Sequence, residues 1–398
     1  MGFPYSRNHD SALCNAYGGS YSHDITSIFP DFDADVNDPM SYDFACTDES
    51  ILVCREAGTE TFFRLGQSIE HHIKKHGTIP PKDFKKWAQI CEHIIMHYNE
   101  GWADGFNLNI QYWEIWNEAN LDYDDSDNKR CWGGTTAEFY DFYETAAKYL
   151  KKRFPNLKIG GPAYAGYAPC GDISWLDAFL CEMKKRNVEF DFVSWHIYNS
   201  TPEKIIRLGE SVKELMIKYG YENAQSICNE WNYIKGWVEE FTYSVKMIHG
   251  LKNAAFITST MCLAQKSSID MLMYYDTRES IFNGIFDFYT AEKLKGYYPM
   301  LWYKNFYMLE NEIRQLGDIE NIYSLCGVDK DGRITAMLTY YTDDDNAENK
   351  KILVDLPQDR EYEVFLLDNE HDGNSSFITN CLEFDMEIYS CILIKEKI

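Results

Sequence analysis

The stretch Tyr112-Trp113-Glu114-Ile115-Trp116-Asn117-Glu118-Ala119-Asn120-Leu121 decides the fold that this sequence predicts. Its first half is aromatic and β-branched, which is the composition of a buried strand. Its second half becomes polar abruptly, with an amide and a carboxylate side by side. We therefore expect Asn117 and Glu118 at the carboxyl end of a strand, where an α/β barrel carries its functional groups.

A second stretch has the same form: Ser226-Ile227-Cys228-Asn229-Glu230-Trp231-Asn232. A single Asn-Glu pair is usually a solvated surface feature, but two pairs that end apolar strands favour a catalytic site. Cleavage of a glycosidic bond needs one carboxyl group to protonate the leaving oxygen. A second must stabilise the positive charge that develops on carbon. Glu118 and Glu230 are the candidates for these two roles.

The rest of the chain predicts two domains. Up to about residue 312, strand-like runs alternate with amphipathic helical patterns, which is typical of a (β/α)8 TIM-type barrel. From residue 313, short alternating runs separated by Asp, Asn and Gly turns predict a C-terminal β-sandwich. We therefore divide the chain into a barrel of residues 1–312 and a β-sandwich of residues 313–398, which should pack tightly because no low-complexity linker separates them.

Trp-Asn-Glu followed by Ala-Asn-Leu at 116–121, and Asn-Glu-Trp-Asn at 229–232, resemble glycoside hydrolase family 39, the β-xylosidase and α-L-iduronidase family of clan A. The resemblance covers nearly the whole chain. In that family the segment that corresponds to residues 2–10 resembles the second barrel strand, so the first strand is expected to be missing. Glu118 then ends the fourth strand and Glu230 the seventh, which are the clan's positions for the acid/base and the nucleophile.

The missing strand would leave the barrel open, and there are three ways to account for it. The C-terminal segment could lend a strand, a neighbouring subunit of a homo-oligomer could donate one, or the N-terminus is shortened. The C-terminal runs are expected to pair within their own sheet, so the first route is the least favoured. We favour a shortened N-terminus, with the catalytic strands still formed because they lie away from the opening.

The resemblance also implies roles for neighbouring residues. Asn117 would hold the sugar hydroxyl adjacent to the reacting carbon. His196 and Tyr198 lie two apart on one strand, so their side chains point to the same side. They look like the family's His-x-Tyr pair, in which His orients the catalytic centre and Tyr contacts the nucleophile. His9 matches the His of the family's Arg-x-His element and is expected in the sugar subsite.

Three further candidates are open to two interpretations. Tyr275 and Asp276 end the last barrel strand, where the family places an aromatic platform, but packing at the barrel rim explains them equally well. Trp231 either stacks on a sugar face or points away into the protein, because adjacent strand residues face opposite sides.

Composition limits the partners and the compartment. The net charge of −25 argues against nucleic acid and anionic membranes as partners. The twelve cysteines show neither zinc-site nor disulfide spacing, which favours a reducing compartment. No secretory signal or bilayer-spanning run is evident, so we expect a cytoplasmic protein. The acidic runs at 329–332 and 343–346 lack a calcium-loop pattern and are expected to be hairpin turns.

We therefore expect retaining hydrolysis of a glycoside or oligosaccharide, most similar to that of a β-xylosidase, without metal or organic cofactor. Another family 39 specificity, for a uronide, arabinoside or glucoside, is the alternative among enzymes. The alternative from a different class is a carbohydrate-binding protein without hydrolytic activity. Its usual signature would be a missing carboxylate, and both carboxylates are present here.

Overall fold

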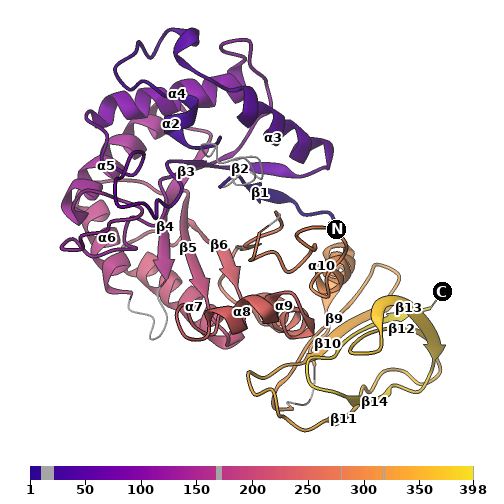
Figure 1. Ribbon diagram of the computed structural model, residues 1–398. Coiled ribbons are helices and arrows are strands. Elements are labelled where there is room, and N and C mark those ends of the chain that lie inside the picture. Colours follow the sequence, from indigo (N-terminus) through magenta and orange to yellow (C-terminus); the bar gives the residue numbers. More distant parts are fainter. Residues whose placement is uncertain (10–21, 167–172, 279, 316, 318, 398) are drawn as a thin grey trace.

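The computed structural model describes residues 1–9, 22–166, 173–278, 280–315, 317 and 319–397. Seven parallel strands form a nearly closed, TIM-like barrel, and an antiparallel domain follows it (Figure 1). The barrel strands are β1 Tyr5–Arg7, β2 Glu60–Leu65, β3 Tyr112–Ile115, β4 Lys158–Gly166, β5 Phe192–Tyr198, β6 Gln225–Asn232 and β7 Met271–Tyr274. Their order in the sheet is their order in the chain, so every carboxyl end points to the same rim.

Helices cover the outside of the barrel (Figure 1). They are α2 Ile25–Ile28, α3 Ala45–Glu56, α4 Phe84–Glu100, α5 Thr136–Arg153, α6 Ser174–Lys185, α7 Pro202–Lys218, α8 Phe241–Ile248, α9 Leu251–Ala264 and α10 Tyr297–Tyr303, with 3-10 turns η1 Pro39–Ser41 and η2 Lys304–Met308. Local sequence sets their ends. Asp83 caps α4 by accepting from two backbone amides, Gly101 ends it in the left-handed region, and Thr135 and Glu138 form a capping box on α5.

The barrel interior is layered because alternate strand residues point inward. The lowest layer is apolar and contains Phe62, Tyr112, Phe192 and Ile227. Two residues further along β1, β2 and β3, the side chains become charged: Arg7, Arg64 and Glu114. Arg64 is fully buried and pairs with Asp24 at 2.7 Å, as a barrel-lining ion pair would. The catalytic candidates lie one layer higher, at the rim.

Within the described residues the barrel has seven strands, one fewer than a (β/α)8 barrel, as predicted. The ends of the sheet, β1 and β7, lie next to each other, but no ladder of hydrogen bonds joins them in the described part of the chain. Gly2 lies against the side chain of Lys304, so η2 approaches the start of β1. The C-terminal strands β12 Tyr362–Leu367 and β15 Cys391–Glu396 pair with each other, so they do not close the barrel.

The C-terminal domain consists of antiparallel sheets. A six-stranded sheet has the order β13-β12-β15-β10-β9-β8, and β11 and β14 form a second, two-stranded sheet. The remaining bounds are β8 Asn311–Glu312, β9 Ile322–Val328, β10 Ile334–Tyr340, β11 Lys350–Leu353, β13 Asp372–Thr379 and β14 Glu383–Met386. A shared apolar core that includes Leu338, Ile352, Val364 and Met386 joins both sheets. The large sheet begins with β8, two residues before the boundary that the sequence suggested.

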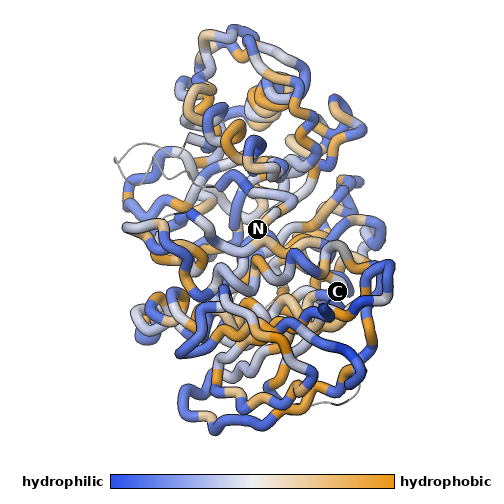
Figure 2. Tube along the Cα trace, turned by 90° about the vertical axis from the view of Figure 1, so that its right-hand side faces the viewer, coloured by the Kyte–Doolittle hydropathy of each residue, from blue (hydrophilic) through white to orange (hydrophobic). Residues whose placement is uncertain are grey.

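Figure 2 shows short hydrophobic stretches interspersed with hydrophilic ones along the coloured part of the chain. Accordingly, none of the helices in the described part of the chain has both the length and the apolar character needed to cross a bilayer. Cys228, Cys262 and Cys391 are buried free thiols, as expected for cysteines that serve as small hydrophobic residues.

Candidate active site

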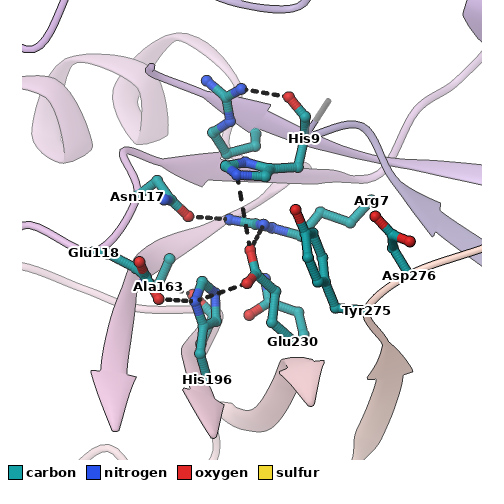
Figure 3. Close-up of polar contacts among 12 residues, drawn as sticks. Arg7, His9, Asn117, Glu118, Ala163, His196, Glu230, Tyr275 and Asp276 are labelled. Atoms are coloured by element: carbon teal, nitrogen blue, oxygen red, sulfur yellow. Dashed lines mark hydrogen bonds and ion pairs between the residues drawn. The ribbon is translucent and has the colours of Figure 1, made fainter. Parts of the chain in front are cut away.

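The two predicted carboxylates meet at the carboxyl rim of the barrel (Figure 3). Glu118 follows β3 and Glu230 lies in β6, and His196 of β5 lies between them. One oxygen of each carboxyl group and one ring nitrogen of His196 lie within 4.8 Å of one another. The rim therefore brings together residues that are more than a hundred positions apart in the chain.

The backbone at the end of β3 is bent to present Glu118. Trp116 and Glu118 both have left-handed φ angles, 71° and 48°, which residues other than glycine adopt only when the surroundings hold them there. Gly66, which directly follows the neighbouring strand β2, makes room for this bend, because a Cβ at position 66 would lie 2.8 Å from the Cα of Trp116. The Glu118 amide donates to the carbonyl oxygen of Ala163 at 3.0 Å, which fixes the bend.

Arg7 is the central cation of the site, and it is not among the candidate residues predicted from the sequence. Its Nη1 donates to Glu230 Oε1 at 2.7 Å, its Nη2 to Asn117 Oδ1 at 2.8 Å and its Nε to Glu114 Oε2 at 2.7 Å. It could have been found from the Arg-Asn-His run, since Arg7 and His9 lie two apart on a strand and share a face.

Glu114 is a second residue that the sequence analysis passed over. It is fully buried, and its other oxygen accepts a hydrogen bond of 2.6 Å from Asn229 Nδ2. A charge within the apolar run of β3 was the available signal, because a buried carboxylate needs a partner. Glu114 holds both Arg7 and the residue next to Glu230, so it supports the site from the layer below.

His196 and Tyr198 of β5 both face the carboxylates, as their spacing predicted. His196 Nδ1 lies 2.8 Å from Glu118 Oε1 and 3.6 Å from Glu230 Oε2. The Tyr198 hydroxyl donates to Glu230 Oε2 at 2.6 Å. The two carboxylates thus share the imidazole of His196, and Glu230 has a guanidinium and a phenol as further partners.

These surroundings keep Glu230 ionised. Burial alone would raise the pKa of Glu230, but its neighbours outweigh burial and lower the pKa to about 2. The neighbours are His196, His9 and Arg7, in that order, and the hydrogen bond from Tyr198 adds to them. A carboxylate with such a low pKa is suited to be a nucleophile, because it is ionised at neutral pH.

His9 borders the same carboxylate, with Nε2 3.9 Å from Glu230 Oε1. Burial, and then the positive charge of Arg7, hold the pKa of His9 well below its usual value. His9 is therefore neutral at pH 7 and presents a hydrogen-bonding ring instead of a charge. Arg7 is then the permanent cation that balances Glu230 at neutral pH.

Tyr275 and Asp276 reach the rim in different ways. The ring of Tyr275 contacts His9 edge-on at a centroid distance of 6.3 Å, so it forms part of the wall around Glu230. Asp276 lies beyond Tyr275 in the view of Figure 3. Its two oxygens accept hydrogen bonds from Arg278 Nε and Ser280 Oγ, both at 2.8 Å. Asp276 therefore helps to anchor the rim loop.

Trp231 does not contribute a sugar-stacking surface, which corrects the functional alternative for this residue. Its side chain is 1% exposed and packs against Phe256 and Tyr274, at centroid distances of 6.0 and 5.3 Å. The ring points out of the barrel towards α9, because Glu230 next to it points inward. Trp231 stabilises β6 from behind.

The trio of Glu118, His196 and Glu230 has ligand atoms close enough to hold a metal ion. Arg7 argues against this use, because its guanidinium lies 2.7 Å from Glu230 and would repel a divalent cation. Two carboxyl groups in contact with an imidazole and a phenol fit proton transfer and nucleophilic attack better than they fit metal binding.

Comparison with known proteins agrees with this geometry. The family model described as glycosyl hydrolases family 39 matches residues 18–274. A "Beta-xylosidase" of Caldicellulosiruptor saccharolyticus is 29% identical over 211 residues, which is 50% of this chain and 37% of that protein. A "Beta-xylosidase" of Geobacillus stearothermophilus is 28% identical over 211 residues, again 50% of this chain and 37% of that protein. The match thus spans little more than a third of the length of these curated relatives.

Solved structures share the fold at low identity. A glucosidase from Croceicoccus marinus has a TM-score of 0.75 at 21% identity and covers 100% of this chain and 89% of its own. A monomeric beta-xylosidase from Caulobacter crescentus CB15 has a TM-score of 0.67 at 16% identity, with 89% and 85% covered. At such identities the likeness shows the fold alone, whereas the family model matches more than half of the sequence. The chain belongs to glycosyl hydrolase family 39.

Proposed function

We propose that this protein is a retaining glycoside hydrolase with Glu118 as acid/base and Glu230 as nucleophile. The observation that carries the proposal is the close approach of the two carboxyl groups, with an oxygen of each within 4.8 Å of the other. Retaining enzymes have carboxyl groups about 5–5.5 Å apart, whereas inverting enzymes need about 6.5–9.5 Å to admit a water molecule. The spacing supports direct attack by one carboxylate.

The contacts support this division of roles. Glu230 is held ionised by Arg7 and Tyr198, so it attacks the anomeric carbon while Glu118 gives its proton to the departing oxygen. The bond to the leaving group breaks, and a glycosyl ester on Glu230 forms. Glu118, now ionised, takes a proton from water, and that water displaces Glu230 from the same carbon. Two inversions give net retention.

The substrate that we propose is a β-xyloside. Support comes from the two relatives named beta-xylosidase, each matched over half of this chain. Glucoside and arabinoside specificities are the alternatives, since structures titled as a glucosidase and as an α-L-arabinofuranosidase share the fold. A uronide is disfavoured by the net charge of −25, because a negative surface repels an anionic sugar. The buried free thiols support a reducing, cytoplasmic setting.

A panel of nitrophenyl glycosides tests the activity, and proton NMR of the first-formed sugar tests retention. Glu230→Ala should abolish turnover, and azide should restore it with an inverted glycosyl azide as product. Glu118→Ala should keep activity on nitrophenyl substrates, because a good leaving group needs no proton. Glu361→Ala, which removes an exposed carboxylate of the C-terminal domain, is the matched control. An inverted sugar from the unaltered enzyme, or exchanged phenotypes of the two variants, would refute the assignment.

A further inference from the structure

A row of aromatic rings leads from the nucleophile to the protein surface. Tyr198, whose hydroxyl donates to Glu230, contacts the ring of Trp237 edge-on at a centroid distance of 5.3 Å. Trp237 in turn stacks on Phe241 with an interplanar angle of 20° and touches Phe282. Trp237 is 50% exposed, although its neighbours in this row are more buried. A supported indole ring with an open side therefore stands one ring away from Glu230.

The segment that carries Trp237 is a rigid extension of the nucleophile strand. Asn232, at the end of β6, donates to the carbonyl oxygens of Tyr275 and Phe282 at 2.6 and 2.8 Å. Further along, the amide of Lys235 donates to Ser244 Oγ at 2.9 Å. The segment 233–237 is thus tied on one side to the rim of β7 and on the other to α8. A ring on such a segment loses little freedom when it binds a ligand.

An acidic loop of the C-terminal domain holds the same segment from outside. Asp343 accepts a 2.9 Å hydrogen bond from the hydroxyl of Tyr233 and pairs with Lys235 Nζ at 3.1 Å. Behind them, Lys252 of α9 is almost fully buried and pairs with Asp343 at 2.8 Å and with Asp345 at 2.9 Å. The sequence predicted a hairpin turn at 343–346, but the loop instead connects β10 to β11, which belong to different sheets. It contacts Tyr233 of the barrel, three residues after Glu230.

We propose that Trp237 is a stacking platform for the sugar ring adjacent to the reacting one, and that Asp343 positions it. The preferred substrate is then an oligosaccharide and not a one-ring glycoside. The C–H faces of a sugar fit an aromatic ring, and one intervening ring places the platform about one sugar unit from the nucleophile. Lys235 and Glu240 flank Gly236 beside the platform and offer polar partners for hydroxyl groups. This inference rests on the proposed function.

The test compares substrates with one ring and with several. In steady-state assays, methyl β-xyloside contains only the reacting ring, whereas xylobiose and xylotriose contain neighbouring rings. Trp237→Ala should lower kcat/KM for xylobiose or xylotriose about tenfold, mostly through KM, and leave methyl β-xyloside unchanged. Trp237→Phe should recover part of the loss. Tyr307→Ala, which removes an exposed aromatic ring at the opposite end of the barrel, is the control and should change neither substrate.

Asp343→Asn tests the positioning role. It should reproduce the selective rise of KM for the oligosaccharides, while Asp331→Asn, in an exposed turn of the same domain, should not. A lower melting temperature with an unchanged ratio of kcat/KM between xylotriose and methyl β-xyloside would show that Asp343 is structural only. An equal loss on both substrates in Trp237→Ala, or no loss on either, would overturn the platform.

A failure of the proposed hydrolytic function can be distinguished from a failure of the stacking platform. If the unaltered protein cleaves neither substrate series, calorimetric titration with xylotriose decides the platform separately, since the stacking surface needs no chemistry. Weaker binding by Trp237→Ala would then support the platform, and equal or absent binding would refute it. If the glycoside panel selects glucose, methyl β-glucoside and cellobiose replace the xylose pair.

Discussion

Replacing Arg7 by methionine removes the only permanent positive charge that contacts Glu230 among the described residues. Arg7 and Glu230 are both nearly buried, with side-chain exposures of 4% and 7%, so water cannot replace the lost contact. The change leaves Glu230 and Glu114 as two buried carboxylates without their shared cation. We predict that Glu230 then titrates within the working pH range of the enzyme.

The size of the shift follows from the geometry. A nitrogen–oxygen distance of 2.7 Å places the two charge centres about 4 Å apart, and Coulomb's law at an effective dielectric constant of about 20 then gives about 4 kcal/mol. That energy corresponds to about 3 pKa units. The pKa of Glu230, now about 2, should therefore rise in Arg7→Met by up to this amount, since His196 and His9 also hold it low. The nearby charge of Glu114 would add to the rise.

The assay is the pH dependence of kcat/KM on a nitrophenyl glycoside. The unaltered enzyme should show no acidic limb above about pH 3, whereas the acidic limb of Arg7→Met should move up towards about pH 5. Arg7→Lys keeps the charge but not the three hydrogen bonds, so its kcat should fall while the acidic limb stays low. An acidic limb that is the same in Arg7→Met and in the unaltered enzyme would refute the electrostatic role of Arg7.

Breaking a buried pair also costs about 3–5 kcal/mol of stability, and circular dichroism must confirm that the variant is folded. Adding Glu114→Gln to Arg7→Met removes one unpaired charge and should restore part of the unfolding free energy. If the double variant were less stable than the single one, Glu114 would not depend on Arg7 for its charge balance.

Three other predictions follow from single contacts. Tyr198→Phe loses the 2.6 Å hydrogen bond to Glu230, and kcat/KM should fall about 10- to 100-fold with an unchanged fold by circular dichroism. Trp231→Ala should cost about 3–5 kcal/mol in urea unfolding and leave KM unchanged, because its ring is in the core; a raised KM would contradict this. His9 has a pKa below its value in the unfolded chain, so its contribution to stability is present above about pH 6.5 and is lost as pH falls. His9→Gln should therefore flatten the decline of the melting temperature between pH 7 and 5, and an unchanged decline would mean that folding does not lower the pKa of His9.

The sequence alone determined which strands carry the two carboxylates and that they meet. Asn117-Glu118 and Asn229-Glu230 each end an apolar run, and parallel strands bring their carboxyl ends to one rim whatever the details of packing. The seven-strand count and the antiparallel C-terminal domain also follow from local periodicity, since alternation and turn residues act over a few positions.

Only the tertiary structure decided what each side chain touches. Arg7 meets partners 107, 110 and 223 positions away, and no local pattern encodes such distances. In a regular strand Asn229 and Glu230 would face opposite sides, yet Asn229 reaches Glu114 while Glu230 reaches Arg7. The pairing of β6 with β7 shifts register between Cys228 and Trp231, and this irregularity lets both side chains point inward.

Side-chain direction also separates Trp231 from Trp237. Trp231 alternates with the inward-pointing Glu230, so its ring lies in the core although it is the next residue in the chain. The exposed ring of Trp237 lies in a segment that the C-terminal domain holds through Asp343, more than a hundred positions further along the chain. Strand composition predicts where a chain runs, whereas the direction of a side chain depends on bulges and on contacts between domains, which form only when the whole chain has folded.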